Sequence, residues 1–197
     1  MTATTEQIKK LRELTGAGVL DAKRTLEQYN GDFDKALAVL KEKGLKAAEK
    51  KAERVARQGV VEAYVHAGGK IGVLVEVNCE TDFVAATNEF KQLAHDLALQ
   101  IAASKPRYVS VNDIPAEELE AQKKIYADAA RAEGKPEALI ERIVQGKLDA
   151  ALNETVLLRQ PFIRDESLTV HDVIQGVIAR VGENIVVRRF VRFELGE

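Results

Sequence analysis

The sequence predicts an α+β protein: an N-terminal bundle of three helices, then a core in which helices pack on a small, mainly antiparallel three-stranded sheet. Three observations lead to this class. Apolar residues recur at helical spacing over residues 4–40, a period-2 pattern runs through residues 60–79, and a last strand at residues 184–195 follows a long helical stretch. Two early strands, a helical middle and a final strand favour α+β over an alternating βαβ order.

Capping signals delimit three helices of roughly ten residues at the N-terminus. Thr4 and Gln7 have capping-box spacing, and Gly16-Ala17-Gly18 ends the first helix in a sharp turn. Asn30-Gly31 ends the second, and Asp32 is a favourable N-cap for the third. The apolar positions are Ile8, Leu11 and Leu14, then Val19, Ala22, Leu26 and Tyr29, then Phe33, Leu37 and Leu40. Such modules bind protein surfaces more often than they carry out chemistry.

A charged connector follows over residues 41–57. Its charged residues include Lys43, Lys46, Glu49, Lys50, Lys51, Glu53, Arg54 and Arg57. We interpret it as a solvated helix and place a domain boundary near its end, which gives a helical domain at 1–52 and an α+β core domain at 53–197. A basic helix that contacts RNA is the alternative, although no aromatic side chains interleave with its charges.

Turn residues and prolines divide the core. Gly68-Gly69 joins strands at 60–66 and 71–79 in a hairpin. Helices are expected at 88–104, 115–132, 136–158 with a candidate break at Gly146, and 169–182 after a capping-box pair, Thr169 and Asp172. On the last strand, Val187, Val191, Phe193 and Leu195 are expected on one face, with Arg188 and Arg192 on the other.

Composition limits the classes of function. The chain has 197 residues, 46% of them hydrophobic, and a net charge of -2, whereas general nucleic-acid binders usually carry a basic surplus. No direct nucleic-acid partner is therefore expected. The N-terminus has no apolar signal core and no long apolar run occurs, so we expect a soluble, cytoplasmic chain and no membrane partner.

The sequence contains few residues in patterns typical of catalytic, metal-binding or phosphate-binding sites. The three histidines, His66, His95 and His171, lack metal-ligand spacing, and no Gly-rich phosphate loop follows a strand. The single cysteine, Cys79, is interpreted as a packing residue, with a Cys79–His66 nucleophilic pair as the alternative. We predict no enzyme activity, no metal and no cofactor.

A polar turn after residue 79 carries a large apolar pair. Glu80, Thr81 and Asp82 interrupt the apolar strand, and Phe83 and Val84 follow at once. A phenylalanine in such a turn commonly folds back onto the core. The alternative is an exposed anchor that inserts into a partner. Composition does not decide between them.

Three segments resemble bacterial elongation factor Ts, the family of guanine-nucleotide exchange factors of elongation factor Tu. They are NCETDFVA at 78–85, LRELTGAGVLDAKRTLEQYNGDFDKALAVL at 11–40, and NIVVRRFVRFEL at 184–195. Their order and spacing resemble a short form of the family over essentially the whole chain. The resemblance implies that the N-terminal bundle is like a ubiquitin-associated (UBA) domain.

The resemblance also implies the partner and the site. A family member would bind GDP-bound elongation factor Tu and promote release of GDP by disturbing the partner's magnesium and phosphate site. The displacing residues would be Thr81, Asp82, Phe83 and Val84, and weaker docking residues would be Val19 and Leu20. A ribosome- or RNA-associated translation protein without exchange activity remains the alternative, since the connector and the arginines of the last strand offer contacts for phosphate.

A homodimer is a further expectation. Longer members of the family carry a second core subdomain and a protruding helical hairpin, and we expect this chain to lack room for either. A three-stranded sheet leaves one face and two edges to cover. Val191 and Phe193 beside Arg189 and Arg192 make an apolar and arginine mixture that is common at interfaces, so two copies are expected to associate through their cores.

Overall fold

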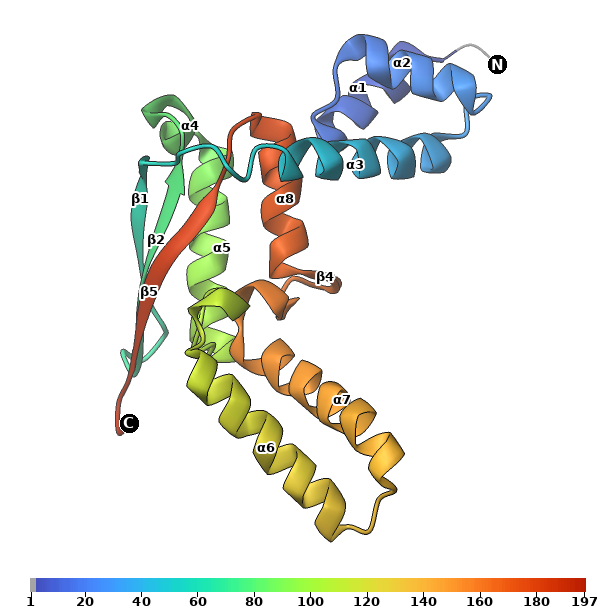
Figure 1. Ribbon diagram of the computed structural model, residues 1–197. Coiled ribbons are helices and arrows are strands. Elements are labelled where there is room, and N and C mark those ends of the chain that lie inside the picture. Colours follow the sequence, from blue (N-terminus) through green and yellow to red (C-terminus); the bar gives the residue numbers. More distant parts are fainter. Residues whose placement is uncertain (1–2) are drawn as a thin grey trace.

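A computed structural model describes residues 3–197 of the chain (Figure 1). Its α-helices are α1 (Thr5–Thr15), α2 (Val19–Gln28), α3 (Phe33–Glu49), α4 (Asp82–Ala86), α5 (Asn88–Ser104), α6 (Ala116–Ala132), α7 (Glu137–Thr155) and α8 (Val170–Val181). Its strands are β1 (Gln58–Val65), β2 (Ile71–Cys79), β3 (Pro161–Phe162), β4 (Asp165–Thr169) and β5 (Val186–Glu194). Strands β1, β2 and β5 form an antiparallel sheet in the order β1-β2-β5. The predicted α+β class is confirmed.

The N-terminal bundle forms where its caps are predicted. Thr4 and Gln7 make both hydrogen bonds of a capping box, and the Asp32 side chain accepts from the backbone N–H of Lys35. The third helix is longer than expected, because α3 continues through Gly44 to Glu49. The third helix of the bundle and the first part of the connector are therefore one continuous helix, and only residues after Glu49 form the irregular link to β1.

Two glycines allow the bundle to pack closely against α8. Gly16 has φ +68°, and a side chain there would meet the Cα of Arg180 at 2.5 Å. A side chain at Gly44 would meet the Cβ of Ala179 at 3.1 Å. Ala48, near the end of α3, is completely buried in the core that lies beneath the sheet. The division into domains at residue 52 remains a prediction.

The main core lies between one face of the sheet and helices α5 and α8. The period-2 pattern predicted for β2 is confirmed, since Val73, Val75, Val77 and Cys79 are all buried. Phe90 and Leu97 of α5 pack against them, together with Ile178 of α8. Figure 1 shows both helices on the same side of the sheet, so its opposite face has no cover among residues 3–197.

The expected faces of the last strand are partly wrong. Glu76 pairs with Arg189 and Val77 with Val187, so Arg188 forms a β-bulge. The extra residue reverses the alternation, so Val187 faces the core whereas Val191 and Phe193 are exposed on the opposite face. Val191, Phe193 and Leu195 do share a face, as predicted, but they do not share it with Val187.

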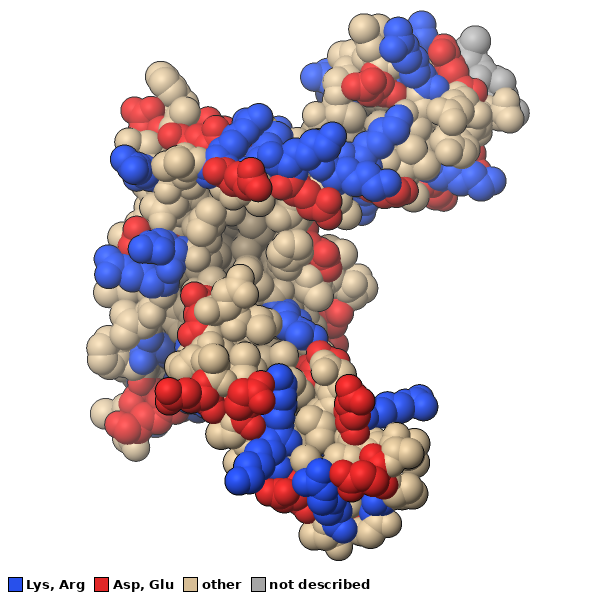
Figure 2. All heavy atoms as spheres, in the orientation of Figure 1, with Lys and Arg blue, Asp and Glu red and all other residues tan. Residues whose placement is uncertain are grey.

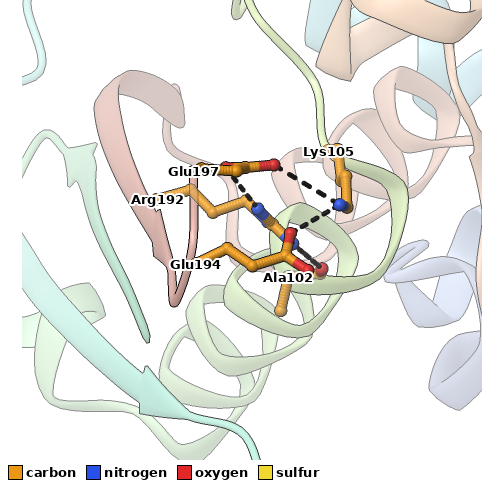
Figure 3. Close-up of polar contacts among 5 residues, drawn as sticks. All are labelled: Ala102, Lys105, Arg192, Glu194 and Glu197. Atoms are coloured by element: carbon orange, nitrogen blue, oxygen red, sulfur yellow. Dashed lines mark hydrogen bonds and ion pairs between the residues drawn. The ribbon is translucent and has the colours of Figure 1, made fainter. Parts of the chain in front are cut away.

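The bulge turns Arg192 toward the helices, where it joins a polar cluster at the end of α5 (Figure 3). Its guanidinium, whose side chain is 7% exposed, donates to the carbonyl of Ala102 at 3.3 Å and to the carboxylate of Glu194 at 2.7 Å. Lys105, the C-cap of α5, also pairs with Glu194, and both cations reach Glu197. The Ala102 carbonyl lies in the last turn of the helix, where intrahelical donors run out. Arg192 thus satisfies it and ties the end of β5 to α5.

A helical hairpin projects from the core, contrary to expectation. Helices α6 and α7 pack against one another and extend away from the sheet (Figure 1). Pro115 and Pro136 are the N-caps of these helices, which begin one residue later than predicted. The candidate break at Gly146 is absent, because α7 is continuous and ends at Thr155, earlier than expected. The chain returns to α8 through the short β3–β4 hairpin, which sequence patterns did not predict.

Candidate functional site

The polar turn after β2 is a short helix rather than a loop. Thr81 is the N-cap of α4, and its side chain accepts from the backbone N–H of Val84. Ala85 is only 8% exposed, and Val84 packs against the main core. These two residues fix the inner face of the helix, so neither Asp82 nor Phe83 is needed for the core, and both are exposed.

Of the two alternatives that the sequence left open for Phe83, burial in the core or exposure to solvent, the structure has the exposed one. Phe83 is 81% exposed, so the interpretation that it folds back onto the core is wrong. The cause is helical geometry, because Ala85 and Val84 occupy the core-facing side of α4 and Phe83 projects from the other. The site therefore offers a rigid aromatic ring to solvent at the end of a buried strand, as a binding anchor requires.

Glu183 holds this helix from outside the motif. Its Oε2 accepts from the backbone N–H groups of Glu80 at 3.2 Å and Thr81 at 3.0 Å, and its Oε1 accepts from the Thr81 hydroxyl at 2.6 Å. Sequence reasoning missed Glu183, because it lies about a hundred residues from the turn and no local pattern marks it. Its one sequence signal is its position directly after Gly182, the glycine that ends α8.

A second set of hydrogen bonds joins the segment after α8 to the start of α4 and to the connector. The Asn184 backbone N–H donates to the Glu80 carboxylate at 2.7 Å. The buried Asn184 side chain donates to the carbonyls of Ala52 at 3.2 Å and Arg54 at 2.7 Å. The segment after α8 thus contacts both the start of α4 and the chain that leads from the N-terminal bundle.

Cys79 has the environment of a packing residue. It is fully buried, and its thiol donates to the carbonyl of Thr81 at 3.1 Å. Burial raises the pKa of the Cys79 thiol, and the negative charge of Glu183 raises it further. Cys79 pairs with Gln58 at one end of the hairpin, whereas His66 bonds to Ile71 at the other. The Cys79–His66 pair is therefore not formed.

The second group of predicted site residues lies on the N-terminal bundle. Val19 and Leu20 occupy the first turn of α2, directly after Gly18, and both are exposed. In Figure 1, α2 and α4 lie at the same end of the molecule, with the end of α8 between them. The structure does not bring the two groups into contact, and each remains a separate candidate surface.

Charges of both signs cover the connector. Figure 2 shows Lys and Arg along α3, with Asp and Glu beside them, and Lys46 pairs with Glu42. Within residues 3–197, no group of three or more His, Cys, Asp or Glu side chains is arranged to hold a metal ion. None of the helices in that part of the chain is long and apolar enough to span a membrane.

The fold and the site define an α+β factor that presents an exposed aromatic side chain on a rigid support. A family model described as Elongation factor TS matches residues 2–197. Elongation factor Ts of Carboxydothermus hydrogenoformans is 56% identical over 194 residues, which cover 98% of this chain and 89% of the relative. That of Coprothermobacter proteolyticus is 56% identical over 190 residues, 96% of each chain. The chain belongs to the elongation factor Ts family.

Proposed function

We propose that this chain is a guanine-nucleotide exchange factor that binds GDP-bound elongation factor Tu and promotes replacement of GDP by GTP. Membership of the elongation factor Ts family supports a role in translation elongation. The observation that carries the proposal is the 81% exposure of Phe83 on a short helix whose other face is anchored in the core. Protein binding is the activity to which this arrangement is suited.

The proposed mechanism is competition for the elements that hold the nucleotide. A GTPase retains GDP through a phosphate-binding loop and a magnesium ion that bridges phosphate and protein oxygens. Phe83 would insert beside that region and shift the elements that hold the ion, because an aromatic ring fills volume at a low cost in conformational entropy. Asp82, exposed next to it, would compete for hydrogen-bond donors or repel the partner's carboxylates. Thr81 and Val84 would hold the helix in place.

Binding linkage makes this displacement reversible. If binding of this chain lowers the affinity of the GTPase for GDP by some factor, then binding of GDP lowers the affinity of the GTPase for this chain by the same factor. GTP then completes the exchange by displacing the chain. No bond is made or broken, so the proposed role requires no catalytic residue, metal or cofactor of its own.

The N-terminal bundle would add affinity. Val19 and Leu20 form an exposed apolar pair at the start of α2, and they are the proposed docking contacts on the GTPase. In this proposal residues 1–52 dock on the GTPase and residues 53–197 displace its GDP. Both would act in the cytoplasm, where translation takes place.

We infer in addition that two copies associate through the uncovered face of the sheet. That face carries the exposed apolar side chains Val61, Val65, Leu74, Val191, Phe193 and Leu195. Cross-strand pairing makes them one continuous patch, since Val65 is opposite Gly72 and Gly72 is opposite Phe193. Monomeric proteins rarely expose large contiguous apolar patches, so a second copy is the proposed cover. Arg192 points away from this face and takes no part.

Release of labelled GDP from elongation factor Tu, with and without the chain, tests the exchange function. Acceleration by substoichiometric chain is expected, because one molecule acts on many partners in turn. A salt-dependent gel shift with ribosomal or transfer RNA, together with unchanged GDP release, would support the RNA-associated alternative instead. The mixed charges along α3 favour the exchange function.

A further inference from the structure

We propose that Glu183 is a positioning residue for Phe83: its carboxylate fixes the start of α4 and thereby the direction in which the phenylalanine leaves the surface. This proposal rests on the exchange function proposed above. It assigns a role to a residue that is distant from the turn in the sequence and contacts it only in the folded structure.

Phe83 cannot be oriented by its own packing, since its side chain is largely exposed. Its direction therefore depends on how α4 is held. A helix of this length is not stable alone, because the nucleation cost exceeds the gain from its few hydrogen bonds. Ala85 and Val84 hold the inner face of α4 through apolar contacts, which are not directional.

Glu183 supplies most of the directional support, with three hydrogen bonds beside the single one from the Cys79 thiol to the Thr81 carbonyl. All of its hydrogen bonds are with Glu80 and Thr81, and it forms no ion pair with a Lys or Arg among the described residues. Hydrogen bonds to a charged acceptor are shorter and stronger than neutral ones. Because Thr81 is the N-cap, fixing its N–H and its hydroxyl sets where the helix begins and how Phe83, two residues later, is rotated.

Glu183 is itself held on both sides. Gly182 before it has φ +83°, a left-handed conformation that ends α8 and turns the chain toward β2. Asn184 after it is buried, with its side chain bonded to the connector and its N–H bonded to Glu80. A site residue needs this kind of support to be placed within about 0.5 Å.

The first test compares Glu183→Ala, Glu183→Gln and Asp96→Ala in release of labelled GDP from elongation factor Tu. Asp96 is the matched control, because its partly buried carboxylate bonds to Gln92 and Arg164. We expect Glu183→Ala to slow stimulated release about tenfold, less than the roughly hundredfold that a misplacement of about 1 Å can cost. Glu183→Gln, which keeps one acceptor oxygen, should recover part of the loss. The control should match the natural chain.

The decisive test combines Glu183→Ala with Phe83→Ala in a double-mutant cycle. If Glu183 acts by placing Phe83, removing Phe83 should cost much less in the Glu183→Ala background than in the natural one. An equal loss in both backgrounds would overturn the proposal, because Glu183 would then act independently of Phe83.

Amide hydrogen exchange of the free chain gives a readout that needs no partner. Glu183→Ala should raise exchange at Val84 and Ala85 while the amides of α5 stay protected. Unchanged protection at these amides would contradict the positioning role. Failure of the exchange function itself is distinguishable, because it would appear in the natural chain as unaltered GDP release.

Discussion

Phe83 and Phe90 lie seven residues apart, and the first is 81% exposed whereas the second is completely buried. The two rings share chemistry and differ only in surroundings. Phe90 fills the core beneath the sheet, and Phe83 adds nothing to that core. The contrast separates residues that stabilise the fold from residues that are free to bind, and it supplies an internal control.

Phe83→Ala should leave the free energy of unfolding within about 0.5 kcal/mol of the natural value, as for surface substitutions without structural contacts. Phe90→Ala should lower it by about 3–5 kcal/mol, because a buried phenylalanine leaves a cavity. Urea denaturation followed by circular dichroism measures both. Comparable losses in the two variants would mean that Phe83 packs against the protein in solution.

Phe193→Glu should convert a dimer into a monomer without loss of fold. Phe193 is 69% exposed on the uncovered sheet face, so a carboxylate there is solvated in the monomer and buried in the proposed interface. Analytical ultracentrifugation at micromolar concentration should find the natural chain at twice its 21.7 kDa mass and the variant at that mass. A natural chain that sediments as a single 21.7 kDa species would refute the dimer.

Glu194→Gln should lower stability at neutral pH and lose its effect in acid. Hydrogen bonds from Lys105 and Arg192 lower the pKa of the Glu194 carboxyl from 4.5 to about 2. A carboxyl whose pKa is lower in the folded state contributes stability above its unfolded pKa and loses it as pH falls. The difference in unfolding free energy between the two chains should therefore shrink from pH 4.5 downward and vanish below pH 2. A difference that stays constant across this range would contradict the ion-pair account.

Removing residues 1–46 should leave a folded core that binds elongation factor Tu more weakly. The deletion keeps Ala48 in the core and keeps the connector carbonyls that Asn184 bonds. It removes Val19 and Leu20, the proposed docking pair. Calorimetric titration with the GDP-bound partner measures the affinity, and an undiminished affinity would exclude the bundle from docking. Loss of fold would mean that the bundle and core form one cooperative unit.

Sequence patterns correctly predicted the features that depend only on residues close together in the chain. The caps at Thr4, Asp32 and Thr169 and the alternation along β2 depend on residues within one turn or one strand, and the structure has them as expected. The bulge at Arg188 is different. It depends on the register between β5 and β2, strands more than a hundred residues apart, so an alternation count on β5 alone assigned Val187 to the wrong face.

The candidate site was predictable only in part, because some of its contacts join residues that are distant in the sequence. The resemblance at residues 78–85 identified the turn, but composition left open whether Phe83 is buried. The answer depends on α4, where Ala85 takes the core position. Glu183 reaches Thr81 across the fold, and neither spacing nor periodicity marks such a contact.

Displacement of nucleotide from a partner by Phe83 can be tested in a single assay. Labelled GDP is released from elongation factor Tu with the natural chain, Phe83→Ala and Ile125→Ala, the last an exposed apolar residue on α6 that serves as a control. The natural chain and Ile125→Ala should accelerate release equally. Phe83→Ala, although folded, should be slower by roughly thirtyfold or more, the effect of losing a binding residue worth at least about 2 kcal/mol. Full acceleration by folded Phe83→Ala, or none by the natural chain, would contradict displacement by Phe83.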